Sequence, residues 1–147
     1  MKLSESIKDK SVRAKISADC AKLIDEQVTA KSGLSGLALK TAYKVVKGIG
    51  SGYIPGAIGR LLPAVFGAID PMWEEGLQIG DPVKHLSQNR ARTADMVLGV
   101  TDARIQKANG IVRSSYNQLR KSVKGDVEEA VPGFAKIIST HVQVISS

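Results

Sequence analysis

The stretch that decides the fold runs from Gly48 to Ile69 and reads GIGSGYIPGAIGRLLPAVFGAI. Arg60 is its only charged residue, in a chain of 147 residues of which 24% are charged. A run so poor in charge must be buried in the protein's own core, against a partner or at a lipid surface. It is not a convincing transmembrane span, which needs about 20 predominantly apolar residues, because six glycines, two prolines and the arginine interrupt it.

Helical spacing divides this run into two unlike faces. From Pro55, which suits the first turn of a helix, apolar side chains recur three and four positions apart. The opposite face presents almost no side chain apart from the arginine, and we expect another helix or a partner to approach it closely. This candidate interaction surface consists of Gly56, Gly59, Arg60, Pro63 and Gly67.

The same spacing recurs on both sides of this run and predicts a single all-α domain over residues 1–147. Aromatic residues make up only 4% of the chain, and runs of β-branched residues are scarce. We expect a bundle of five to seven helices, with kinks at Pro63 and Pro132. The predicted helices cover residues 11–31, 36–49, 55–69, 83–108, 111–124 and 126–145, with a short segment over 70–79.

Local signals refine these boundaries. Ser11 is placed as the N-cap of the first helix, and Asp70-Pro71 is read as the start of the short segment over 70–79. Asp126 with Glu129 is read as a capping pair for the last helix. The 36–49 helix is expected to turn an apolar face inward and lysines outward. The inward set includes Leu37, Ala42, Val45 and Val46, and the outward set is Lys40, Lys44 and Lys47.

Several segments resemble a family of small bacterial proteins of unknown function. The segments are Asp19-Cys-Ala-Lys-Leu-Ile-Asp25, Lys31-Ser-Gly-Leu-Ser-Gly-Leu-Ala-Leu-Lys40, Tyr43-Lys-Val-Val-Lys-Gly48 and Val100-Thr-Asp-Ala-Arg104. The resemblance covers the chain from about residue 12 to residue 141. It implies a small helical bacterial protein and transfers no functional residue.

The chain has only one cysteine and two histidines, and we expect no catalytic residue, metal site or cofactor. Cys20 lies on an apolar helix stripe and is read as an inert small hydrophobe. His141 lies in line with apolar residues and is read as a partly buried histidine with a hydrogen-bonded ring nitrogen. The glycines of the 48–52 segment lack the Lys-Ser/Thr of a phosphate-binding loop.

Two further features of the sequence bear on where the protein is located in the cell. The single cysteine makes no internal disulfide, and no apolar segment precedes Glu5 and Asp9 to serve as a secretory signal. These observations predict a cytoplasmic protein, with attachment to the surface of a membrane as the alternative.

The net charge of +7 is unevenly distributed. Residues 84–124 carry nine basic and two acidic side chains, which favours contact with phosphates or anionic surfaces. The candidate anion-binding residues of this region are Arg113, Arg120, Lys121 and Lys124.

Three functions fit these observations. The first is a non-enzymatic helical interaction module that binds a protein partner, a second copy of itself or an apolar ligand. The second is a membrane-surface protein whose Gly48–Ile69 segment inserts shallowly, with lysines and Arg60 facing anionic head groups. The third is nucleic-acid binding through the basic 84–124 region, although that region has only one aromatic residue, Tyr116, to stack on a base.

Overall fold

The computed structural model describes residues 2–146, except for the side chains of Ser35 and residues 143–146. It is all-α, with 86% of the chain helical and no strand in the described residues. Eight α-helices and one 3-10 turn follow one another along this part of the chain. They are α1 (Leu3–Ser6), α2 (Lys10–Ala30), α3 (Gly33–Lys47), α4 (Tyr53–Ile79), α5 (Pro82–Gln88), α6 (Arg90–Arg104), η1 (Ile105–Lys107), α7 (Gly110–Leu119) and α8 (Val123–Ser146).

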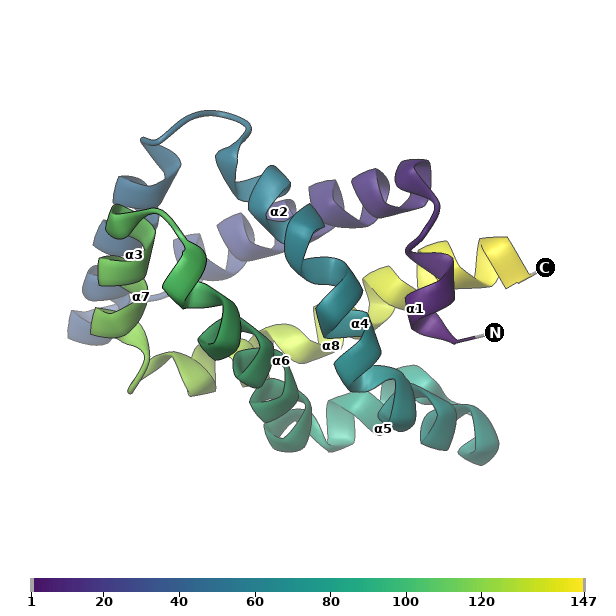
Figure 1. The fold of residues 1–147 in the computed structure, drawn as a ribbon. Coiled ribbons are helices and arrows are strands. Elements are labelled where there is room, and N and C mark those ends of the chain that lie inside the picture. Colours follow the sequence, from purple (N-terminus) through teal and green to yellow (C-terminus); the bar gives the residue numbers. More distant parts are fainter. Residues whose placement is uncertain (1, 147) are drawn as a thin grey trace.

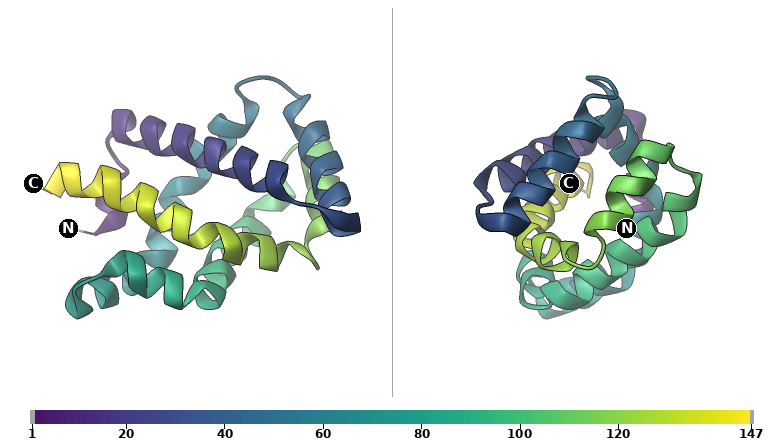
Figure 2. Two further views of the ribbon diagram at one scale, coloured as in Figure 1. Left: turned by 180° about the vertical axis from the view of Figure 1, so that it is seen from behind. Right: turned by 90° about the vertical axis from the view of Figure 1, so that its left-hand side faces the viewer.

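Three long helices make the centre of the molecule. Helices α2 and α8 lie side by side, and α4 packs across α2 and contacts α8 through Phe66 and Phe134 (Figure 1; Figure 2, left). Helices α3 and α7 stand together at the end of the molecule that is remote from the two termini, while α5 and the last turns of α4 lie at the other side (Figure 1). The elements are joined by short connections, as the absence of long polar linkers predicts.

The apolar face of the 48–69 segment lies inside the protein. Leu62, Val65, Phe66 and Ile69 of α4 are buried in the central core, together with residues of α1, α2, α5 and α8. The rings of Phe66 and Phe134, on α8, lie 6.3 Å apart between centroids in a tilted arrangement. The protein's own core therefore covers this face. Burial of apolar area of this kind is the main favourable term in folding.

Helix α4 is longer than the sequence predicts, since it continues through Asp70 and Pro71 without a break. The predicted start of a separate segment there is wrong. The Asp70 carboxylate instead accepts hydrogen bonds from the backbone N–H of Leu3 (2.6 Å) and the hydroxyl of Ser4 (2.7 Å). Asp70 thus binds the start of the short helix α1, whose Leu3 is buried in the core. The sequence pattern did not predict α1. Pro63 and Pro132 also lie inside continuous helices, α4 and α8.

Other boundaries differ for local reasons. Asp9, rather than Ser11, caps α2, because its carboxylate accepts from the N–H groups of Ser11 and Val12. The helix predicted over 83–108 is divided at Asn89 into α5 and α6. This division and α1 bring the helix count of the described residues to eight, above the five to seven predicted.

Helix α3 is rotated relative to its predicted orientation. Leu37 and Val45, expected inside, are 62% and 48% exposed, whereas Ala42 is buried as predicted. Tyr43 faces α2, where its hydroxyl donates to Asp25 at 3.0 Å. Tyr43 and the buried Ala42 therefore mark the side of α3 that meets the bundle, and the side that contains Leu37 is left toward solvent.

Candidate functional site

A cavity of about 310 Å³ lies between α2, α3, α4, α6 and α8. Its walls are almost entirely apolar. They are formed by Cys20, Leu23, Ile24, Gln27, Val28, Lys31, Leu39, Ile58, Leu61, Leu62, Val65, Val97, Thr101, Val123, Asp126, Val127, Ala130, Val131 and Phe134. Ligand pockets are typically of about 300–1,000 Å³ and lined mainly by apolar side chains, so this cavity is the candidate functional site.

The helical repeat explains how the walls arise. Helices α2, α4 and α8 each contribute a strip of residues spaced three and four apart, as a single face of a helix requires. Helix α3 contributes only Leu39 and α6 contributes Val97 and Thr101. The strips face one another across a space that their side chains do not fill. The cavity is therefore an apolar pocket, open to solvent, that lies beside the core that buries Phe66.

Polar groups gather at the end of the cavity formed by Lys31 and the first turns of α8. The Lys31 ammonium lies 3.0 Å from Asp126 Oδ1 and also forms an ion pair with Glu129. The ammonium is hydrogen-bonded to both carboxylates. The hydrogen bond to Glu129 and, to a lesser degree, the one to Asp126 raise the pKa of Lys31 above its ordinary value. One cation thus faces two carboxylates. Asp126 and Glu129 do not form the predicted capping pair, because α8 begins at Val123 and both carboxylates bind Lys31.

Thr101 contributes a hydroxyl to the cavity wall, and this hydroxyl already has hydrogen-bond partners within the protein. Its Oγ1 lies 2.7 Å from the Tyr116 hydroxyl of α7 and donates to the Leu98 carbonyl at 3.0 Å. No buried side-chain nitrogen or oxygen in the described residues lacks a hydrogen-bond partner. The described cavity wall therefore offers no unpaired buried polar atom to a ligand.

Cys20 is in the cavity wall and carries an unreactive thiol. Burial, followed by the nearby charge of Asp19, raises the pKa of Cys20 to about 12. Since the thiolate is the nucleophilic form, this environment is that of an apolar packing residue. The structure agrees with the sequence-based interpretation of Cys20 as a small hydrophobe.

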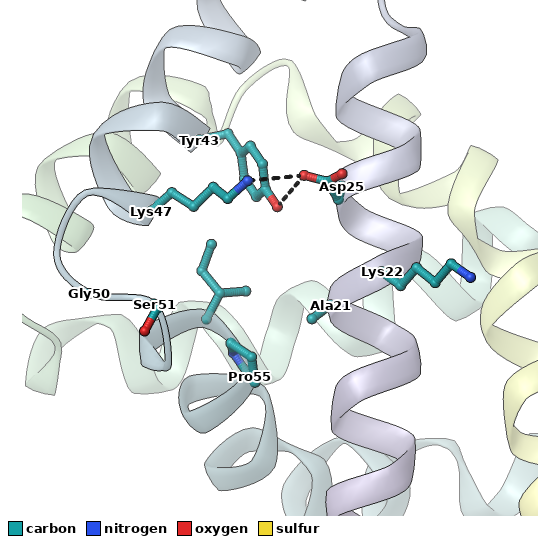
Figure 3. Close-up of a pocket in the computed structure, with 9 residues that line it drawn as sticks. Ala21, Lys22, Asp25, Tyr43, Lys47, Gly50, Ser51 and Pro55 are labelled. Atoms are coloured by element: carbon teal, nitrogen blue, oxygen red, sulfur yellow. Dashed lines mark hydrogen bonds and ion pairs between the residues drawn. The ribbon is translucent and has the colours of Figure 1, made fainter.

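A second pocket, of about 300 Å³, lies on the other side of α2 and is more polar (Figure 3). Asp25 of α2 accepts from the Tyr43 hydroxyl at 3.0 Å and from the Lys47 ammonium at 3.4 Å, both on α3. Burial and then the hydrogen bond to Asp25 raise the pKa of Tyr43 to about 12. Gly50 and Ser51 of the glycine-rich loop and Pro55 of α4 complete the rim. The polar groups of this pocket fasten α3 to α2.

The candidate interaction surface on α4 is only partly covered. Gly56, Arg60, Pro63 and Gly67 are exposed. Gly59 is half-buried, and a Cβ atom added there would lie 3.2 Å from the Ser17 hydroxyl of α2. A helix approaches the bare face closely at that one position. Arg60 lies over the ring of Tyr53, 6.0 Å from its centroid.

The candidate anion-binding residues are not brought together as one free set. Arg120 binds Asp102 through its Nε at 2.7 Å, and Lys124 forms an ion pair with Asp95 at 2.9 Å. Arg113 and Lys121 have no carboxylate within ion-pair distance among the described residues.

The two histidines are each paired with one carboxylate. His85 Nε2 lies 3.0 Å from Glu75, and His141 Nε2 lies 2.6 Å from Asp19. The hydrogen-bonded, half-buried state predicted for His141 is confirmed. Within residues 2–146, the described side chains hold no cluster of three or more His, Cys, Asp or Glu suited to a metal ion, and no helix is both long and apolar enough to cross a membrane.

Sequence reasoning identified most wall residues as apolar helix faces, but it did not identify the cavity or the Lys31 cluster. Comparison with known proteins agrees with the resemblance noted in the sequence. The model of a family of unknown function, DUF6918, matches residues 3–142. No curated protein and no solved structure matches the chain.

Proposed function

The chain belongs to this family of unknown function, and we propose that it binds a small, neutral, apolar ligand in the cavity between α2, α4 and α8. The observation that carries the proposal is a space of about 310 Å³ whose walls are almost wholly apolar. Most of the wall residues are only half-buried, so apolar surface is left accessible to water. A ligand that fills the pocket removes this surface from water, which is favourable.

The volume limits the size of the ligand. At about 310 Å³, the cavity is at the lower end of the range of about 300–1,000 Å³ that is typical of ligand pockets. A medium-length alkyl chain or a compact cyclic hydrocarbon suits a pocket of this volume.

The charges at the Lys31 end limit the chemistry of the ligand. Asp126 and Glu129 together outnumber the Lys31 cation, which both of them already bind. A carboxylate or phosphate entering here would meet net negative charge. The proposal therefore specifies a ligand without an anionic head group, which distinguishes it from a fatty-acid carrier.

Thermal unfolding with two matched ligands tests the proposal. 1-Decanol and decanoate share one alkyl chain and differ in the charged end. A ligand at about 100 times its Kd adds about 2.7 kcal/mol to the free energy of unfolding, on the order of 8 °C in Tm for a domain of this size. We expect a rise of this order with 1-decanol below its solubility limit, and a much smaller rise with decanoate at neutral pH.

Filling the cavity provides the matched control. Ala130 lines the cavity and Ala91 is exposed on α6, so Ala130→Phe should abolish the shift with 1-decanol while Ala91→Phe should keep it. Val97→Phe fills the same space from another wall and replaces Ala130→Phe if that variant does not fold. An unchanged Tm with 1-decanol, or an equal shift in the filled and control variants, would refute the proposed site.

A further inference from the structure

Helix α3 carries an apolar strip on its outer surface. At 100° per residue, Leu34, Leu37, Ala38, Thr41 and Val45 fall on one side of the helix, and all five are exposed. Leu34 is 88% exposed, the highest value of any large apolar side chain described. The Thr41 hydroxyl donates to the Leu37 carbonyl at 2.9 Å, so it does not require water as a partner. We call these five residues the α3 strip.

Basic side chains border the α3 strip. Lys40, Lys44 and Lys47 follow one edge of it along the helix, and all three are exposed. Lys47 is paired with Asp25, whereas Lys40 and Lys44 have no carboxylate within ion-pair distance among the described residues. Helix α7, which packs beside α3, adds the exposed Ile111 and Arg113. The end of the molecule formed by α3 and α7 thus combines exposed apolar and basic groups.

The charge pattern of the whole chain makes this end distinct. Residues 27–69, which contain α3, and residues 103–125, which contain α7, carry eleven basic side chains and no acidic one. The rest of the chain carries ten basic and fourteen acidic side chains. Folding brings α3 and α7 side by side (Figure 1; Figure 2, right). Positive charge is therefore concentrated where the apolar strip is exposed.

Acidic groups from neighbouring helices neutralise only part of this charge. Asp25 is bound by Tyr43 and Lys47, and Asp102 is bound by Tyr116 and Arg120. Asp126 and Glu129 share Lys31, as described above. The bases that remain without a carboxylate at ion-pair distance in the described structure include Lys40, Lys44, Lys107, Arg113 and Lys121.

From this combination we propose that the α3–α7 end docks on an anionic membrane surface, with the α3 strip in the interface and the lysines toward lipid head groups. An interfacial helix binds through its buried apolar area together with electrostatic attraction to anionic lipids. The location differs from the Gly48–Ile69 segment, whose apolar face fills the core. Docking does not depend on the proposed cavity ligand.

The charge around the α3 strip favours lipid over a macromolecular partner. Leu34, Leu37 and Val45 are exposed beside the lysines of the same helix. A second copy placed on the α3 strip would bring the lysines of two α3 helices together, which is electrostatically unfavourable. Nucleic acid satisfies the lysines but leaves the leucines exposed to water. A fluid anionic surface accommodates both kinds of side chain.

Co-sedimentation with vesicles tests the proposal. We expect the full-length protein to bind vesicles of phosphatidylglycerol and phosphatidylcholine at low salt, and to bind pure phosphatidylcholine much more weakly. Replacing Leu34 and Leu37 by serine should weaken binding by more than about tenfold. Lys40→Gln and Lys44→Gln should each weaken it by about fivefold, with an effect that disappears at high salt.

The chain offers a matched control at its other side. Leu77 and Ile79 at the end of α4 are 47% and 71% exposed but lie near Glu74, Glu75 and Asp81 in the chain. Leu77→Ser with Ile79→Ser should leave vesicle binding unchanged. Leu37→Trp should show a blue-shifted emission on addition of anionic vesicles, and Ile79→Trp should not. The native Trp73 is buried and supplies a constant background.

Several outcomes would overturn the docking proposal. One is a protein that stays in the supernatant with phosphatidylglycerol vesicles at low salt. Another is equal loss of binding in the α3 and α4 serine variants. A dimer in light scattering that Leu34→Ser and Leu37→Ser dissociate would assign the α3 strip to a second copy, and salt-dependent binding of RNA or DNA without vesicle binding would assign it to nucleic acid. The cavity-filled Ala130→Phe protein should still bind vesicles, which separates this test from that of the cavity ligand.

Discussion

Cys20 connects the chemistry of one residue to the state of the cavity, because it is the only cysteine of the chain and lies in the cavity wall. Its pKa of about 12, against an ordinary 9.0, leaves roughly a thousandfold less thiolate near neutral pH. We expect alkylation by iodoacetamide at pH 8 to be about a thousandfold slower in the native protein than in the urea-unfolded protein. Mass spectrometry of the labelled protein measures both rates.

A ligand in the cavity should slow the labelling of Cys20 further, since the ligand stabilises the closed native state. 1-Decanol is the probe, and the Ala130→Phe variant, in which the cavity is filled, is the control. Rapid labelling of the native protein, comparable to that of the unfolded chain, would contradict the buried environment of the thiol.

Two glycines of α4 have opposite roles. A Cβ atom added at Gly76 would lie 2.5 Å from the Pro82 Cα, a backbone atom that cannot move aside, whereas one added at Gly67 meets nothing within 4 Å. Gly76→Ala should lower the free energy of unfolding by about 1–3 kcal/mol through overpacking. Gly67→Ala should raise it by up to about 1 kcal/mol, because alanine is the better helix former.

Urea denaturation of the two glycine variants under the same conditions measures the difference. Equal effects of the two substitutions would mean that α4 and α5 are not as close as the structure has them.

Among the elements, α3 is the most loosely held of the longer helices. Of its described side chains only Gly36 and Ala42 are buried, and the hydrogen bonds from Tyr43 and Lys47 to Asp25 attach it to α2. Asp25→Ala removes the acceptor and leaves the half-buried Tyr43 hydroxyl without its partner. We expect faster backbone hydrogen exchange over residues 36–47 and unchanged exchange in α5.

The control for the α3 attachment is Glu26→Ala, which changes the neighbouring exposed carboxylate. Hydrogen exchange followed by mass spectrometry of peptides from α3, α4 and α5 gives the comparison. If Asp25→Ala and Glu26→Ala have the same effect on α3, the Asp25 cluster does not hold this helix.

The elements also show what the sequence can predict. The spacing of apolar residues identified α2, α3, the first part of α4 and α8, because the period of 3.6 depends on local geometry alone. It did not predict that α4 continues through Pro71, since Asp70 is used by Leu3 and Ser4, which lie far away in the sequence. Nor did it predict the rotation of α3, which depends on a hydrogen bond between Tyr43 and a different helix.

The cavity illustrates the same limit for the candidate site. Leu61, Val97 and Val131 are recognisable as residues of apolar helix faces, but a void among them depends on the distances between helices. Those distances follow from the packing of all side chains together, which no single periodic pattern contains. The uneven distribution of charge along the chain was visible in the sequence, but the gathering of the basic segments was not, because it depends on α3 lying beside α7.

At the scale of the whole molecule, exposed carboxylates connect neighbouring helices through hydrogen bonds and ion pairs. Asp102 of α6 holds Tyr116 and Arg120 of the α7 region, and Glu75 of α4 holds His85 of α5 and Arg92 of α6. The Arg120 and Tyr116 hydrogen bonds lower the pKa of Asp102, and those of His85 and Arg92 lower the pKa of Glu75. Both carboxylates are therefore more acidic in the folded protein than in the unfolded chain.

This difference sets the sign of the pH dependence. Because the unfolded chain binds protons at these two carboxylates before the native protein does, their stabilising contribution is complete above the ordinary pKa values of 3.8 and 4.5. It is lost as the pH falls through the lower native values. We expect the midpoint of urea denaturation to fall steadily below about pH 4.5, and to fall less steeply at about 1 M salt, which screens exposed pairs. Asp102→Asn with Glu75→Gln should reduce this slope, and a double variant that loses stability with pH as steeply as the parent would show that other carboxylates control the acid response.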